Sequence, residues 1–256
     1  MNAEVALIGG TGLYDLAFKE AREMTINTVY GDVDLIVGRL GGRPTAFLPR
    51  HKKGHSLPPH LVNYRANISG LKQIGIKRIF ATASTGSLNM EMEPGHFVLL
   101  DQFIDFTKSR PLTFYEGGSS GVVHTDMTEP YCPQLRGVVI SEAEQLPIDL
   151  HHGGVYVCTE GPRFETPAEI QMYKRLGGDL VGMTNVPEVV LAREAGICYS
   201  TVAVVTNFAA GISPQPLSHA EVVAEMEKSI HELRELLAAC AAHTPDKFDC
   251  RCGRNE

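Results

Sequence analysis

Two groups suited to holding a small anion follow short apolar segments of the sequence. The run Gly9-Gly10-Thr11-Gly12 comes directly after the apolar residues 4–8. There, backbone N–H groups and the Thr11 hydroxyl can approach an anion. Arg50 and His51 end a second apolar segment, and a guanidinium binds phosphate through paired hydrogen bonds. The glycine run lacks the third glycine of a dinucleotide fingerprint and the Lys-Ser/Thr of a P-loop.

Two further polar positions follow apolar segments in the same way. Ala83-Ser84 lies where a third apolar segment gives way to the small residues 83–87, and Thr184 follows a fourth segment. Taken singly, Arg50 could be a surface charge, and Ser84 and Thr184 could be turn hydroxyls. Because the carboxyl ends of parallel strands meet at one edge of a sheet, the four groups together predict a phosphate site.

The composition fits a single soluble globular domain. The chain has 256 residues, 43% of them hydrophobic, and 30 acidic against 23 basic side chains give a net charge of −7. Such a balance argues against a nucleic-acid partner, and the only dense basic cluster, at 50–53, suits one small anion. No apolar run approaches the roughly 20 residues that cross a bilayer. The first residues lack the pattern of a signal peptide, so we expect a cytoplasmic protein.

The elements that must position these groups alternate between strands and helices. Apolar runs and turn signals predict strands at 4–8, 34–37, 44–48, 78–82, 96–100, 154–158, 180–183 and 199–205. Helical periodicity and capping boxes at 166–169 and 218–221 predict helices at 62–74, 167–176, 187–195 and 219–242. This order predicts an α/β fold, with one mixed or largely parallel sheet surrounded by helices. Residues 1–244 form the domain, and 245–256 form a polar tail that we expect to be loose.

Sequence motifs along nearly the whole chain resemble the purine nucleoside phosphorylase and methylthioadenosine phosphorylase family. The most specific are TEGPRFET (159–166) and GMTNVPEVVLAREAGICY (182–199). They are joined by IGGTGL (8–13), PRHKKGH (49–55), VNYRANI (62–68), LKQIGIKRI (71–79), TGSL (85–88), PGHFVLLDQFIDFT (94–107), EPYCP (129–133) and VTN (205–207). The resemblance implies the nucleoside phosphorylase fold, a homotrimer, and phosphorolysis that needs no cofactor beyond inorganic phosphate as a co-substrate.

The family resemblance also assigns residues to the site. It implies phosphate binding by Thr11, Arg50, His51, Ser84 and Thr184, with Ala83 contributing its backbone. Met183 should pack under the ribose and Phe164 against the purine face, although such side chains after strands are otherwise usually core residues. His124 matches a family position that reaches into a neighbouring subunit's site.

Two positions separate the purine specificities of the family. Methylthioadenosine phosphorylases usually have a T-D-x-D pattern where this chain has Thr206-Asn207-Phe208-Ala209, so both acidic positions, 207 and 209, are replaced. The Asn207 amide can donate to purine N7 and a 6-oxo group. The Glu165 carboxylate can accept the N1–H that 6-oxopurines carry, whereas adenine N1 would face it as another acceptor. A solvated acid near a helix N-terminus is the other interpretation of Glu165.

A third position concerns the sugar. His219 in the segment SHAEV resembles the histidine near the 5′-hydroxyl in phosphorylases of inosine and guanosine, although it could simply begin a capped helix. We therefore predict phosphorolysis of inosine and guanosine, with Asn207, Glu165 and His51 as catalytic residues. A methylthioinosine phosphorylase is the second candidate, followed by a methylthioadenosine phosphorylase. A nucleoside hydrolase and a non-catalytic binding module are candidates from other classes.

The six cysteines give no clear metal motif. They are Cys132, Cys158, Cys198, Cys240, Cys250 and Cys252, and only the last two are close in sequence, as C-x-C. We expect reduced thiols and no structural metal. The resemblance leaves disulfides open, because Cys132, Cys198 and the C-x-C match disulfide-forming positions of heat-stable relatives.

Overall fold

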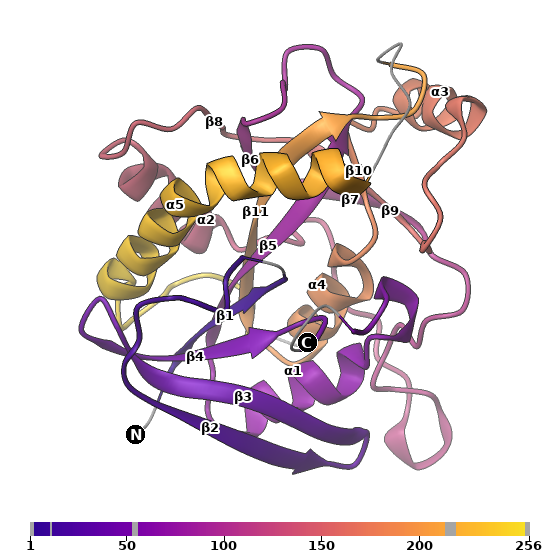
Figure 1. The fold of residues 1–256 in the computed structure, drawn as a ribbon. Helices are drawn as coiled ribbons and strands as arrows, with labels where there is room; N and C mark the ends of the chain where they lie inside the picture. The colour runs from indigo at the N-terminus through magenta and orange to yellow at the C-terminus, as the bar shows by residue number, and fades with distance from the viewer. Residues whose placement is uncertain (1–2, 11, 53–55, 213–218, 254–256) are drawn as a thin grey trace.

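The protein folds around a mixed β-sheet (Figure 1). The structure is a computed structural model that describes residues 3–10, 12–52, 56–212 and 219–253, with only the helical backbone of 219–221. Within these residues the sheet has 11 strands. They are β1 (Val5–Gly9), β2 (Lys19–Thr28), β3 (Gly31–Leu40), β4 (Arg43–Pro49), β5 (Arg78–Ser87), β6 (Phe97–Leu99), β7 (Gln102–Phe106), β8 (Leu150–His151), β9 (Val155–Thr159), β10 (Leu180–Gly182) and β11 (Cys198–Phe208).

The centre of the sheet is β5, which pairs with three other strands. Its first residues lie parallel to β1, its last residues lie antiparallel to β10, and β11 runs parallel to it along its whole length. The strand order is β2-β3-β4-β1-β5-β10-β9-β7, and β11 leads from β5 to β6 and β8. The predicted α/β fold with a mixed sheet is confirmed.

Two hydrophobic cores lie on opposite faces of this sheet. Alternate residues of β1 divide between them: Val5 and Leu7 belong to one core, and Ala6 and Ile8 belong to the other. This is the period of two that a strand imposes on its side chains. Both faces of β1 are covered, which explains why its sequence is almost continuously apolar.

Helices cover both faces. They are α1 (Tyr64–Gln73), α2 (Pro133–Ala143), α3 (Pro167–Arg175), α4 (Asn185–Glu194) and α5 (His219–His243), with short 3-10 turns η2 (Pro59–Leu61) and η3 (Gly118–Ser120). The apolar sides of α1 and α4 pack into the core that contains Ala6, and those of α2 and α5 into the core that contains Val5. Figure 1 shows α5 crossing the sheet over β11 and β5.

Each predicted strand and helix overlaps an observed one, and the first predicted capping box is present. The Thr166 hydroxyl accepts from Glu169 N, and the Glu169 carboxylate accepts from Thr166 N. The second box, at 218–221, includes Ser218, which lies outside the described residues. No helix in the described ranges is long and apolar enough to cross a membrane.

Two expectations about local structure are wrong, and four elements were not predicted. The segment 83–87 is not a loop but the end of β5, whose small side chains let β10 and β11 pack on both sides. β2, β7, β8 and α2 were not predicted. The tail is not loose up to residue 253: Arg78 donates to Asp246 O at 2.6 Å, its guanidinium lies over the Phe248 ring, and Cys252 is buried.

Candidate active site

A single cavity collects most of the residues that the sequence assigned to the site. Its lining includes Gly10, Arg50, His51, Pro59, Thr82, Ala83, Ser84, Thr85, Gly86, Phe164, Glu165, Val181, Gly182, Met183, Thr184, Val204, Thr206, Asn207, Ala209, Val222, Val223 and Met226. Every assigned residue whose side chain is described lies in this lining, except His124. That histidine is exposed and lies outside the cavity.

Two assigned side chains lie outside the part of the chain that the structure describes. Thr11 lies outside the described residues, and so does the side chain of His219, whose backbone begins α5. Neighbouring residues on both segments nevertheless line the cavity: Gly10 precedes Thr11, and Val222 lies on the first turn after His219. Their roles stay predictions.

The cavity forms where strands end or bend. β1 and β4 are parallel and in register from Val5 opposite Thr45 to Gly9 opposite Pro49, so Gly10 and Arg50 emerge side by side. On the other side of β5, the register with β11 shifts between Val205 and Asn207. Such an irregularity re-aims the side chains that follow it. Asn207 thereby lies opposite Gly86, where a Cβ atom would approach Asn207 Nδ2 to 3.2 Å.

Arg50 supplies the buried positive charge of the cavity. Its Nε and Nη2 donate to the two carboxylate oxygens of Glu188 at 2.8 and 2.7 Å, and its Nη1 donates to Thr82 O at 2.8 Å. Burial disfavours the charged guanidinium, but the charge and hydrogen bonds of Glu188 outweigh that cost and raise the pKa of Arg50. These bonds use three of its five N–H groups, so two remain for an anion.

Glu188 was not predicted to belong to the site. It has no exposed surface, and Tyr199 also donates to it, at 2.6 Å. It lies on α4 in the apolar run 186–192, where a lone carboxylate is a signal of a buried partner. An acid in a helix is usually solvated, so that signal alone does not identify Arg50 as the partner.

His51 is oriented by the loop that follows it. Its Nδ1 lies 2.8 Å from Leu57 O, and a carbonyl only accepts, so Nδ1 carries a hydrogen. Nε2 can then donate to an anion when the ring is protonated, or accept from a protonated phosphate oxygen when it is neutral. Gly10 gives this ring its room, because a Cβ there would lie 3.3 Å from His51 Cδ2.

Two hydroxyls and a backbone segment complete this end of the cavity. Ser84 is exposed to the cavity from β5, next to buried Ala83. Thr184 precedes α4 and its backbone N–H donates to Tyr156 Oη at 3.2 Å. This end of the cavity therefore combines a guanidinium, an imidazole and hydroxyls, the groups that bind phosphate.

Glu165 and Asn207 form the other polar end. The Thr159 hydroxyl donates to Glu165 Oε1 at 2.7 Å. Burial raises the pKa of the Glu165 carboxyl, and the hydrogen bond from Thr159 offsets this only in part. Asn207 Nδ2 donates to Phe208 O at 2.9 Å, and Thr206 donates to Asn207 Oδ1 at 2.9 Å. Because Phe208 O can only accept, this bond fixes which amide atom is the nitrogen and leaves one N–H available.

Phe164 and Met183 are not core residues. Phe164 is 40% exposed, which is high for a phenylalanine, and it faces the cavity. Met183 is half-buried. The loop that contains Gly161 passes so close to it that a Cβ on Gly161 would lie 2.5 Å from the Met183 sulfur. Both therefore offer apolar surface to a ligand in the cavity.

The cavity does not contain the metal-ligand cluster of the described chain. Among the described residues, the one group of metal-ligating side chains close enough to share an ion is Cys132, Cys198, Cys250 and Cys252. None of these cysteines lines the cavity.

Comparisons with known proteins identify the family of the chain. The model of the family described as "Phosphorylase superfamily" matches residues 4–242. The chain belongs to this superfamily. It is 54% identical over 249 residues to a probable 6-oxopurine nucleoside phosphorylase of Moorella thermoacetica, covering 97% of this chain and 96% of the relative. It is 52% identical over 253 residues to the 6-oxopurine nucleoside phosphorylase of Pyrococcus furiosus, again covering 97% and 96%.

A solved structure extends the agreement to the fold. A methylthioadenosine phosphorylase from an antarctic soil metagenomic library superposes with a TM-score of 0.91 at 36% identity, covering 100% of this chain and 91% of that one. The predicted family and the nucleoside phosphorylase fold are therefore confirmed.

The buried pair of Arg50 and Glu188 allows a stability prediction. We expect Glu188→Gln to lower the free energy of unfolding by about 3–5 kcal/mol, because it leaves a buried guanidinium without its counter-charge. Urea denaturation followed by circular dichroism measures the change. Glu235→Gln is the matched control: its carboxylate lies 3.4 Å from His231 on the exposed side of α5, so its loss should cost less than about 1 kcal/mol. Equal effects of the two variants would contradict the importance of the buried pair.

Proposed function

We propose that this chain is a 6-oxopurine nucleoside phosphorylase, which splits inosine and guanosine with inorganic phosphate into the free base and ribose 1-phosphate. The observation that carries the proposal is the division of the cavity into two ends. Arg50 bonds to Thr82 of β5, whereas Asn207 lies opposite Gly86, roughly 13 Å further along that strand. Thr159 bonds to Glu165 and to Gly182 O, close to where β10 pairs with Gly86, so Glu165 belongs to the same end as Asn207. The names of the Moorella and Pyrococcus relatives support the same activity.

The cationic end would bind phosphate and place it beneath the sugar. Arg50 is held rigidly by Glu188 and Thr82, so its remaining N–H groups are oriented before phosphate arrives. As the bond from C1′ to the base lengthens, positive charge develops on the ribose, and bound phosphate stabilises it electrostatically. Its oxygen then forms the new bond to C1′ while the base leaves with the electrons of the broken bond.

The purine end would stabilise the leaving base. The available N–H of Asn207 can donate to N7, where negative charge grows as the bond breaks, and Glu165 can accept from N1–H. Interactions that strengthen with this charge accelerate the reaction. Adenine has no N1–H, so an acceptor would face an acceptor, at a cost of about 1–3 kcal/mol.

A methylthioinosine phosphorylase is the second candidate, and one observation favours it. Val222, Val223 and Met226 of α5 line the cavity and give it an apolar wall. Such a wall suits a 5′-methylthio group, whereas the predicted contact of His219 suits a 5′-hydroxyl. Both candidates use the same purine and phosphate contacts.

We also propose a cytoplasmic homotrimer in which each His124 serves a neighbouring site. The exposure of His124 in the single chain and its place outside the cavity lining support a role between subunits. Sedimentation of the full chain measures the oligomeric state.

Initial rates with five nucleosides, each with and without phosphate, test the proposed function. We expect phosphate-dependent cleavage of inosine and guanosine, and weak activity with adenosine and methylthioadenosine. A preference for methylthioinosine would agree with the proposed purine contacts but contradict the predicted contact of His219 with a 5′-hydroxyl. A preference for adenine nucleosides, or equal rates without phosphate, would contradict the proposal.

The role of Asn207 is tested by Asn207→Ala. We expect kcat with inosine to fall on the order of 100-fold, because a donor to the leaving base in the transition state is lost. Asn27→Ala is the control, since Asn27 lies on β2 and its exposed side chain donates to Asp32 Oδ1 at 2.8 Å. Near-normal turnover of Asn207→Ala would remove this residue from the mechanism.

The raised pKa of Glu165 predicts an acid limb in the pH profile. Accepting N1–H requires the carboxylate, so kcat/KM for inosine should fall as the pH drops through the raised pKa, above the usual value of about 4.3. Glu165→Gln should lower kcat/KM and abolish this limb. Glu169→Gln is the control, because the bond from Arg163 holds the pKa of Glu169 at about 2, and its loss should leave the limb in place.

The raised pKa of Glu165 also predicts how ionisation of this carboxyl changes the stability of the fold with pH. A folded-state pKa above the unfolded value stabilises the protein below the unfolded pKa, and this contribution is lost as the pH rises through the folded pKa. Ionised Glu165 therefore costs stability at neutral pH, and Glu165→Gln should not lower the melting temperature there. A marked drop in that temperature would mean that Glu165 is primarily structural.

A further inference from the structure

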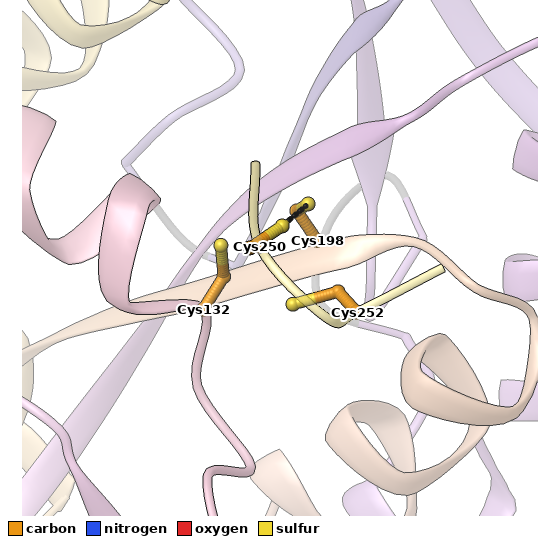
Figure 2. Close-up of side chains that lie close together, drawn as sticks. All are labelled: Cys132, Cys198, Cys250 and Cys252. Atoms are coloured by element: carbon orange, nitrogen blue, oxygen red, sulfur yellow. Dashed lines mark hydrogen bonds between the residues drawn. The ribbon is translucent and has the colours of Figure 1, made fainter. Parts of the chain in front are cut away.

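Four cysteines from three segments far apart in the sequence converge at one point of the fold (Figure 2). Cys132 immediately precedes α2, Cys198 begins β11, and Cys250 and Cys252 belong to the C-terminal tail. All four sulfur atoms lie within 4.8 Å of one another, and those of Cys198 and Cys250 are 3.3 Å apart. Three different segments thus present their sulfurs to one shared centre.

The cluster differs from the other cysteines of the chain. Cys158 and Cys240 are each fully buried as single thiols in apolar surroundings, which is ordinary for cysteine. In the cluster, Cys132, Cys198 and Cys252 are buried and Cys250 is half-buried. The sulfurs therefore have one another as their main polar neighbours and are shielded from solvent, as the ligands of a structural metal are.

The spacing of the sulfurs fits one small ion. Zinc binds thiolates at about 2.3 Å, which in a tetrahedron places the sulfurs about 3.8 Å apart. The Cys198 and Cys250 sulfurs are 3.3 Å apart and no pair of the four is separated by more than 4.8 Å, so the cluster has the size of such a site. We propose that Cys132, Cys198, Cys250 and Cys252 form a four-thiolate site for a single Zn²⁺ ion. The expectation from the sequence that the chain has no structural metal is replaced by this proposal.

The protons of the cluster can be displaced by a cation. Zinc would bind four thiolates and release their protons, with no change in oxidation state. A disulfide pair would instead need an oxidant.

The ion would fasten the C-terminal tail to the sheet. Arg78 and Gln134 already hold this segment, through bonds from Arg78 to Asp246 O and from Asp249 N to the Gln134 side chain. Four protein ligands leave no open position for substrate, which is typical of structural zinc. Cys198 is also nine residues from Asn207 along β11, roughly 30 Å, so the ion would take no part in the reaction.

The metal content of the full chain, purified with a thiol reductant and no chelator, tests the proposal. We expect about one zinc ion per chain by elemental analysis. Replacement by Co²⁺ should give thiolate-to-metal charge-transfer bands and the visible bands of tetrahedral cobalt. This spectrum is measured on the unmodified chain, so it does not depend on whether a variant folds.

Variants identify the ligands. Cys132→Ser and Cys252→Ser should each lower bound zinc by at least about tenfold and lower the melting temperature. Cys158→Ser and Cys240→Ser, which change buried cysteines outside the cluster, should keep the zinc. Loss of zinc in all four variants would contradict the assigned ligands.

Two results on the unmodified chain would overturn the proposal. One is free thiols that bind neither Zn²⁺ nor Co²⁺. The other is an intact mass, without reductant, that is lower by the hydrogens of two disulfides among these four cysteines. Neither result depends on the substrate of the enzyme, so the proposed function and the zinc site can fail separately.

Discussion

The buried pair of Arg50 and Glu188 is the interaction on which the cavity depends. A guanidinium with almost no exposed surface is stable only beside a counter-charge, and Glu188 supplies it through two hydrogen bonds. The pair joins the end of β4 to α4, and Tyr199 extends it to β11. Three elements that approach the cavity from different directions are thereby fixed to one another. An anion entering the cavity meets a cation that is already oriented.

The other end of the cavity follows a different design. Glu165 and Asn207 are held by neutral hydroxyl and carbonyl partners within a few residues along the chain or on the adjacent strand. Burial acts on the Glu165 carboxyl more strongly than the positive charge of Arg163, so the pKa of Glu165 stays raised. The cationic end is thus built for a permanent charge, whereas the purine end is built for hydrogen-bond recognition.

The sequence predicted most of the fold and the positions of most site residues. Apolar β1 and the capping box at Thr166 carry strong local signals, and the motifs around Arg50, Glu165 and Asn207 are specific. β2 was not predicted because most of its residues are exposed and only Met24 and Ile26 give it an apolar side. Glu188 and the four-cysteine cluster were not predicted for another reason. Their partners lie 52 or more residues away, and no local pattern records which distant residues meet.

The pairing of β11 with the central strand β5 has a consequence for how the chain reaches this fold. β5 and β11 are direct partners, and the bond from Thr85 to Val204 O joins residues 119 positions apart. Chains rich in such distant contacts fold slowly, and synthesis delivers the N-terminal strands first. The edge of β5 that pairs with β11 therefore stays uncovered until residue 208 has been made. Because β11 also supplies Asn207, the cavity can bind no ligand during that interval, and substrate cannot assist the early steps of folding.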